Sequence, residues 1–198
     1  MSELASGNAM GETVTLRAGV TRSGDTALVS LTLSNRGQEP LVIFDRPMGY
    51  QTLNVADAVG RHFSHVELLD DGTVLLGMIV PFPGTKTVEV SVIPCVTVVP
   101  SGTEVSRSTT LPLPLAEFNS YYGVLPESAT KLMTGTGLAV WVDYLWLGPD
   151  IKLIRDEKSG CDRIEALPFN KIRRVKASVG GAQIPIRKRF DRFHEEVK

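Results

Sequence analysis

The chain has 198 residues, of which 42% are hydrophobic and 22% charged, and its formal net charge is −1. These values are close to globular averages, so they exclude a globally disordered chain and allow a single domain with a sizeable core. No apolar run approaches the roughly 20 residues that a membrane helix needs.

The first residues contain neither a basic n-region nor an apolar h-region, so we expect no secretory signal. The expected location is the cytoplasm, or outside it if a leader has been removed. Residues 1–11 are small and polar, which predicts a disordered lead-in.

The clearest pattern runs through the first quarter of the chain. Residues 13–20 and 27–34 alternate apolar and polar side chains, as strands do when one face packs on a core. The intervening turn, TRSGD, predicts a hairpin. A second turn at residues 35–40, NRGQEP, leads into residues 41–44, which are apolar on both faces and predict a fully covered strand.

Short strands continue along the chain. An irregular loop is expected at residues 45–61, with an uncertain strand at 50–55. Residues 64–69 and 73–80 flank an Asp-Asp-Gly turn and predict a hairpin. Further strands are expected at 87–92, 96–99 and 104–111, and short helical turns at 116–122 and 127–133. Residues 138–147 are apolar on both faces, which predicts a central strand covered on both sides.

Two turns carry a resemblance to a known family. NRGQEP at residues 35–40 joins two early strands, and PSG at residues 100–102 precedes a polar strand. This arrangement resembles bacterial immunoglobulin-like sandwiches over roughly residues 13–147. The chain departs from antibody-type domains, since it lacks their Cys–Trp–Cys spacing, and the loop at 45–61 is long.

The resemblance implies an all-β, immunoglobulin-like antiparallel β-sandwich at residues 12–147. Such sandwiches serve binding, adhesion or scaffolding more often than catalysis. The resemblance transfers no functional residue, and fold alone does not fix function.

The last quarter of the chain differs in charge. Residues 151–198 hold 13 Lys or Arg against 7 Asp or Glu, whereas residues 1–150 hold 8 against 15. We expect one hairpin with strands at 151–155 and 163–167, and a second that turns at Gly180-Gly181. Residues 148–198 are therefore predicted to form a basic β extension with a charged tail, which packs on the sandwich or on a partner.

The two cysteines, Cys95 and Cys161, lack the spacing of a zinc site. Because no secretory signal is expected, we predict two unconnected thiols, with one disulfide as the alternative.

Catalytic and metal-binding patterns are weak. His62 and His65 stand three positions apart, which places them on opposite faces of a strand, so a metal site with the nearby Asp70 and Asp71 is not expected. The chain has no nucleophile elbow, and its Gly-Thr-Gly segment at 135–137 lacks the lysine of a phosphate loop. We therefore predict no enzyme activity and no cofactor.

Basic and aromatic side chains are the candidate contacts for a partner. A hairpin at Gly180-Gly181 would join two basic clusters into one surface for phosphates, the alternative being ion pairs with the acidic sandwich. Trp141 and Trp146 are expected in the core, with a sugar platform as the alternative. The candidate partner-binding residues are Tyr121, Tyr122, Arg173, Arg174, Lys176, Arg187, Lys188 and Arg189.

These features favour a non-enzymatic interaction or structural module that binds another protein or self-associates. One alternative is a protein that binds nucleic acid or another polyanion through its basic C-terminal segment. The other is a carbohydrate-active or hydrolytic protein that uses His62, Asp70 or Asp71.

Overall fold

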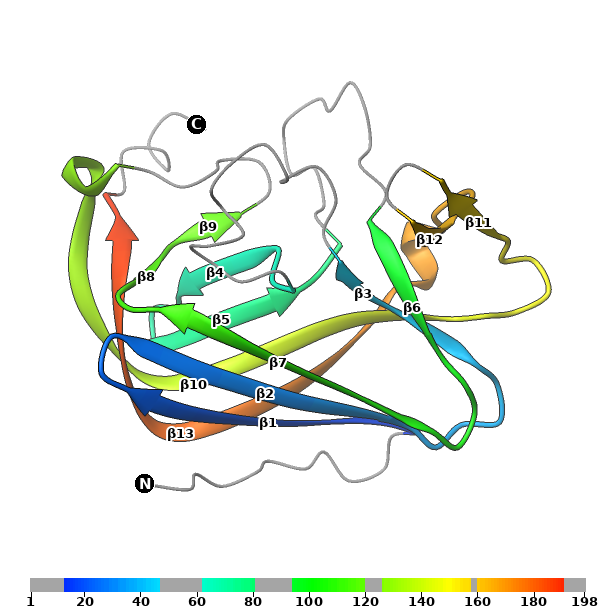
Figure 1. The fold of residues 1–198 in the computed structure, drawn as a ribbon, viewed down its shortest axis with the longest axis horizontal. Helices are drawn as coiled ribbons and strands as arrows, with labels where there is room; N and C mark the ends of the chain where they lie inside the picture. The colour runs from blue at the N-terminus through cyan, green and yellow to red at the C-terminus, as the bar shows by residue number, and fades with distance from the viewer. Residues whose placement is uncertain (1–12, 47–61, 81–93, 120–125, 158–159, 191–198) are drawn as a thin grey trace.

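The computed structural model describes residues 13–46, 62–80, 94–119, 126–157 and 160–190 (Figure 1). Within these residues the regular structure is β, apart from two 3-10 turns at Glu127–Ala129 and Phe169–Lys171. The expected all-β sandwich is confirmed. The described residues contain no helix long and apolar enough to cross a membrane. The strands expected at 50–55 and 87–92 lie outside the described residues.

A three-stranded sheet forms one layer of the molecule, in the order β1 (Val14–Ser23), β2 (Thr26–Asn35) and β7 (Glu104–Pro112). All its pairings are antiparallel. The alternation explains this layer, because every second residue along most of β1 and β2 is apolar and buried, whereas the residues between them are mostly polar and face outward. Gly24, with φ of 56°, allows the tight reversal between them, so the first predicted hairpin is confirmed.

The second sheet is larger, and its central strand is the long strand β10 (Thr130–Trp146) (Figure 1). Its other strands are β3 (Leu41–Arg46), β4 (His65–Leu68), β5 (Thr73–Met78), β6 (Cys95–Val99), β8 (Leu115–Ala116), β9 (Phe118–Asn119), β11 (Leu153–Asp156), β12 (Cys161–Ile164) and β13 (Arg173–Arg189). Beside β10 lie β13 and β3, both antiparallel, and β5, which is parallel.

The side chains of β10 explain why it is central. Leu138, Val140 and Val142 belong to the main core between the two sheets. On the opposite face Leu145 belongs to a second hydrophobic cluster, which also contains Phe44 of β3 and Ile164 of β12. The predicted strand covered on both sides is therefore confirmed, and it begins at Thr130. The helical turn expected at 127–133 is restricted to Glu127–Ala129. The turn expected at 116–122 is wrong for residues 116–119, which hold the end of β8 and all of β9, and residues 120–122 lie outside the described part of the chain.

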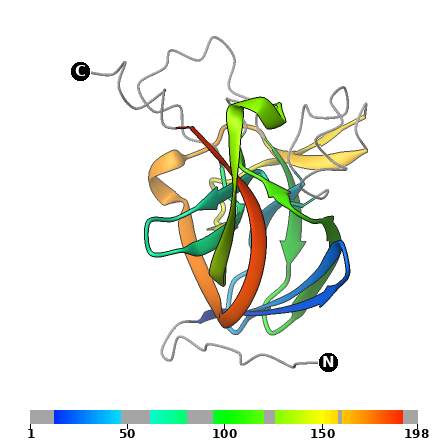
Figure 2. The same cartoon turned by 90° about the vertical axis from the view of Figure 1, so that its left-hand side faces the viewer.

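The hairpin predicted at Gly180-Gly181 is wrong, since β13 passes through both glycines as one 17-residue strand. Gly135 pairs with Ile184 and Gly137 with Gly180, so three residues of β13 face one residue of β10. The positive φ of Gly181, 72°, therefore serves a bulge within the strand rather than a chain reversal. At one end of the molecule, β10 and β13 curve upward side by side (Figures 1 and 2).

Glu117 joins two strands that do not pair directly. Its Oε1 accepts a hydrogen bond from the Leu68 N–H of β4 at 2.8 Å, and its Oε2 accepts one from the Arg189 N–H of β13 at 2.8 Å. Since β8 pairs with β13 and β9 pairs with β4, residues 115–119 and this carboxylate complete a ring with β5 and β10. The upper part of the larger sheet is thereby closed on itself.

A disulfide joins Cys95 of β6 to Cys161 of β12, with 5.7 Å between the Cα atoms. The expectation of two unconnected thiols is thus wrong. Sequence spacing could not decide this point, because the cysteines lie 66 residues apart and meet only through sheet pairing. The bond ties the β11–β12 hairpin, which was predicted, to the body of the sandwich.

Candidate functional site

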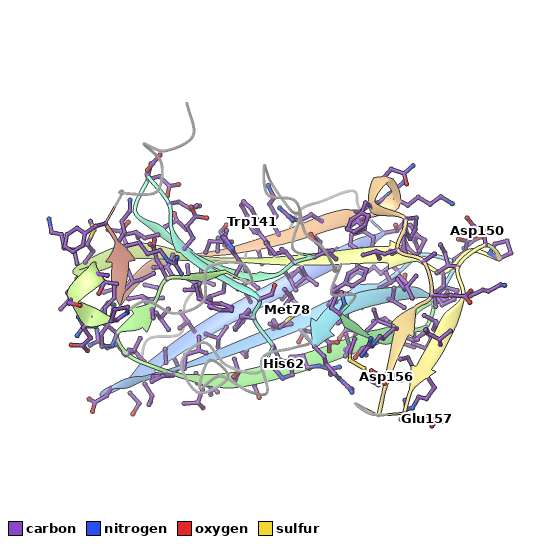
Figure 3. All side chains as sticks on the ribbon, turned by 90° about the horizontal axis from the view of Figure 1, so that it is seen from above. His62, Met78, Trp141, Asp150, Asp156 and Glu157 are labelled. Atoms are coloured by element: carbon purple, nitrogen blue, oxygen red, sulfur yellow. A yellow bond between two sulfur atoms is a disulfide. The ribbon has the colours of Figure 1, made fainter. Side chains whose placement is uncertain are left out.

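The outer face of the larger sheet, where β10 pairs with β13, holds the candidate site. Register places Trp141 opposite Lys176 and Asp143 opposite Arg174. Alternate residues of β10 enter the main core, so Trp141 and Asp143 project from the other face. Figure 3, which shows the molecule from above, places Trp141 beside β13.

Asp143 is a buried carboxylate with its charge fully compensated. It is 1% exposed, and Arg174 binds it bidentately, with Nε at 2.6 Å from Oδ1 and Nη2 at 3.0 Å from Oδ2. The backbone N–H of Val80 donates to Oδ2 at 3.0 Å. Bidentate pairing holds the planar guanidinium in one orientation. Asp143 therefore fixes Arg174 on the surface of the sheet.

Trp141 is half-buried and lies against two cations. The Arg174 guanidinium carbon is 5.0 Å from the centroid of the indole ring, and the Lys176 ammonium is 4.5 Å from it. Both distances fit cation–π attraction. Trp141 belongs to neither hydrophobic cluster of the described residues, so the expected core position is wrong, and the ring is engaged by two cations of its own chain. It holds two positive groups close together at fixed positions on a rigid strand pair.

From Trp141, a row of residues at matching register positions continues across the neighbouring strands β5 and β4. Gly77 of β5 lies opposite Trp141, and His65 of β4 lies opposite Gly77. With neighbouring strands about 4.8 Å apart, His65 and Trp141 are roughly 10 Å from each other. The His65 Nε2 lies 2.8 Å from Glu67 Oε2. Across this face the order is therefore His65 with Glu67, then the glycine at position 77, then Trp141 with its two cations.

The second basic cluster lies at the other end of β13. Arg187, Lys188 and Arg189 pair with the first residues of β10. An extended strand separates Lys188 from Arg174 by roughly 45 Å of chain, so the clusters do not form the joined surface that a hairpin would create. The glycines between them make a bulge, not a reversal, which is the physical reason for this correction.

Three ion pairs connect the basic end of the chain to acidic residues that precede it. Arg174 pairs with Asp143, Lys171 with Asp150, and Arg187 with Glu127. The hydrogen bond from the Lys171 ammonium is the main cause that lowers the pKa of the Asp150 carboxyl. Part of the charge asymmetry is therefore used for pairing within the chain.

The histidine and turn carboxylates predicted as an alternative site do not converge. The His62 Nδ1 lies 3.0 Å from the backbone oxygen of Asp45, before β4, whereas Asp70 and Asp71 occupy the turn after it. Asp71 accepts a hydrogen bond from the Thr73 N–H at 2.8 Å, and this bond lowers the pKa of its carboxyl. In the part of the chain that the structure describes, no three His, Cys, Asp or Glu residues are grouped to hold a metal.

The remaining aromatic candidates divide into two groups. Trp146 packs on the main core, with its ring edge-on to Tyr144 at 6.0 Å between centroids, so it is a structural residue as expected. Tyr121 and Tyr122 lie outside the described residues.

A buried ion pair between the sheets was not found from the sequence. Asp45 of β3 is fully buried, and its Oδ2 accepts hydrogen bonds from Arg107 at 2.7 Å and from Thr97 at 3.0 Å. Its Oδ1 has no partner within the described part of the chain. Arg107 occupies an inward-facing position of β7, and a charge at such a position was the available signal. The ion pair therefore links β7 of the smaller sheet to β3 of the larger sheet.

No protein-family model, curated protein or solved structure matches the chain.

Proposed function

We propose that this protein is a non-enzymatic binding module that docks an acidic segment of a partner protein on the face formed by Trp141, Arg174 and Lys176. The observation that carries the proposal is the pair of cations held against one indole ring at 5.0 and 4.5 Å. An anionic group on a partner would meet positive charges that are already positioned. Little side-chain entropy is then lost on binding.

The composition of this face supports a protein ligand. Tryptophan and arginine are enriched among the residues that dominate protein interfaces. Asp143 binds Arg174 through Nε and Nη2, which leaves Nη1 without a hydrogen bond among the described residues. A carboxylate of the partner can accept from that nitrogen and from the Lys176 ammonium together.

Nucleic acid is the second candidate ligand, and the geometry supports it less. A duplex needs several phosphate contacts along one surface. The two basic clusters stand at opposite ends of β13, and Lys171 and Arg187 are already paired with carboxylates. Association with a second copy stays an alternative partner. We also propose that the chain is related to the immunoglobulin-like sandwiches. The disulfide favours an oxidising compartment as the place where the protein acts.

The test compares a fluorescent peptide of alternating Glu and Phe, its Lys-containing counterpart and a labelled DNA duplex, by anisotropy with the full chain. We expect the acidic peptide to bind, and Lys176→Glu to weaken it by about tenfold. Lys188→Glu is the matched control, because it makes the same charge change at the far end of β13.

Each result is informative. Absence of binding by the acidic peptide overturns the proposed ligand. Equal weakening by both variants indicates non-specific attraction. Tighter binding of the duplex that Lys188→Glu abolishes favours the polyanion alternative, and light scattering at low and high salt decides whether copies of the chain associate instead.

A further inference from the structure

A surface groove lies on the opposite layer of the molecule, far in sequence from the residues discussed above. It runs over residues 17–21 of β1 and 30–32 of β2, the blue strands of Figure 1, and has a volume of about 340 Å³. This volume falls within the range of small-molecule sites, roughly 300 to 1,000 Å³. The groove is on the outward face of the three-stranded sheet, away from the core.

Gly19 creates the depression at the middle of the groove. It pairs with Ser30 across the strands, whereas Arg17 and Thr21 stand on either side of it on the same face of β1. A Cβ atom at position 19 would lie 3.2 Å from the Ser30 hydroxyl, so any larger side chain would occupy the space now open. A glycine within a strand often marks a bulge, a tight bend, or a close approach by a ligand or another backbone, and the register of β1 with β2 is unbroken at Gly19.

The lining is polar, with unused hydrogen-bonding capacity. Within the described part of the chain, the side-chain hydroxyls of Thr21 and Ser30 make no hydrogen bond. Arg17 donates to Glu104 at 3.3 Å, and Ser34 donates to the same carboxylate at 2.6 Å. The guanidinium at this end is therefore held in place and its charge is balanced.

These features select a neutral polyhydroxyl ligand. Glu104 disfavours an anion, and free hydroxyls disfavour an apolar ligand because they would be desolvated without a partner. A peptide strand that lay in the groove would rest on the face of the paired strands β1 and β2 and not along the outer edge of β1, so it could not extend the sheet from there. Sugar hydroxyls donate and accept at once, as Ser and Thr hydroxyls do. Leu28, 46% exposed and opposite Thr21, offers an apolar contact for the C–H face of a sugar ring.

We infer that this groove binds a neutral saccharide, with Gly19 as its floor and Arg17, Thr21 and Ser30 as its polar contacts. The inference is independent of the docking face around Trp141, which lies on the other sheet. It adds a carbohydrate ligand to a protein-binding module and requires no catalytic residue.

The test is a glycan array of neutral oligosaccharides built from glucose, galactose, mannose, xylose and N-acetylglucosamine, with sulfated and carboxylated glycans alongside. The strongest neutral binder is then titrated into the labelled full chain and followed by NMR. We expect amide shifts concentrated at residues 17–21 and 30–32. Ser30→Ala weakens binding by about fivefold, and Gly19→Val abolishes it.

Ser108→Ala is the matched control, because Ser108 is the partner of Ser30 on β7 and is exposed on the same face outside the groove. Thermal melts identify any variant that fails to fold. The inference is overturned if no neutral glycan binds, if charged glycans alone bind, if shifts gather around Trp141, or if a folded Gly19→Val chain keeps its affinity.

Discussion

The disulfide between Cys95 and Cys161 makes the sharpest stability prediction. It closes a loop of 66 residues, and in the chain-entropy model such a cross-link stabilises a fold by about 4 kcal/mol because it restricts the unfolded chain. For a chain of this size each kcal/mol changes the melting temperature by about 2 to 4 °C. We therefore expect the Cys95→Ala/Cys161→Ala protein to melt roughly 8 to 16 °C lower.

Differential scanning calorimetry in the absence of reductant is the assay. Alanine is the better replacement, because both cysteines are buried and serine would leave hydroxyls that need partners. Reductant should lower the melting temperature of the wild-type chain by a similar amount and leave the double variant unchanged. A variant that melts within about 2 °C of wild type would refute the argument that the cross-link restricts the unfolded chain.

Hydrogen exchange separates global from local effects of the same change. The β11–β12 hairpin pairs with β6 through one register position, Asp162 with Val96. We expect amides of the hairpin to exchange faster in the double variant than amides of β10. Uniform acceleration across both would show that the bond stabilises the whole sandwich equally.

Three further changes test the packing. Asp143→Ala leaves its guanidinium partner and a buried N–H unpaired and should cost about 2 to 4 kcal/mol in urea unfolding, whereas a cost below about 1 would contradict the buried pair. Gly37→Ala places a Cβ 2.5 Å from the Trp146 ring and should cost about 1 to 3 kcal/mol, with altered tryptophan fluorescence. Lys171→Met should raise the Asp150 pKa toward its ordinary value in an NMR titration. Since the pair lowers that pKa, its stabilisation is present at neutral pH and is lost as the pH falls through the carboxyl range, so an unmoved pKa would exclude the pair.

Much of the fold was predictable where side-chain alternation is strong. Residues 13–20 and 27–34 became β1 and β2, and the apolar run at 138–147 became the core of β10. Local pattern failed at Gly180-Gly181, because positive φ suits both a hairpin turn and a bulge. The choice depended on β10, whose extension to Thr130 supplies a partner for β13 beyond the glycines. Residues 130–136, TKLMTGT, show no alternation of apolar and polar side chains that would predict this extension.

The candidate sites were less predictable than the fold, since they depend on register between distant strands. Arg174 and Lys176 were identified from charge alone, but their contact with Trp141 requires a pairing across more than 30 residues of sequence. The groove at Gly19 was missed because each of its residues is ordinary on the solvent face of a strand. Its only signal in the sequence is a glycine in the middle of an otherwise regular alternation.

The outer faces of the two sheets differ in which of their charged and polar side chains already have a partner within the chain. Arg107 and Asp45 form an ion pair between the two sheets, in the interior and away from both outer faces. On the larger sheet, Asp143 neutralises Arg174 but not Lys176, so positive charge remains beside Trp141. On the smaller sheet, Glu104 balances Arg17, and free hydroxyls remain. One face is therefore suited to a carboxylate and the other to a neutral sugar. Because the faces lie on opposite layers, occupation of one leaves the other accessible.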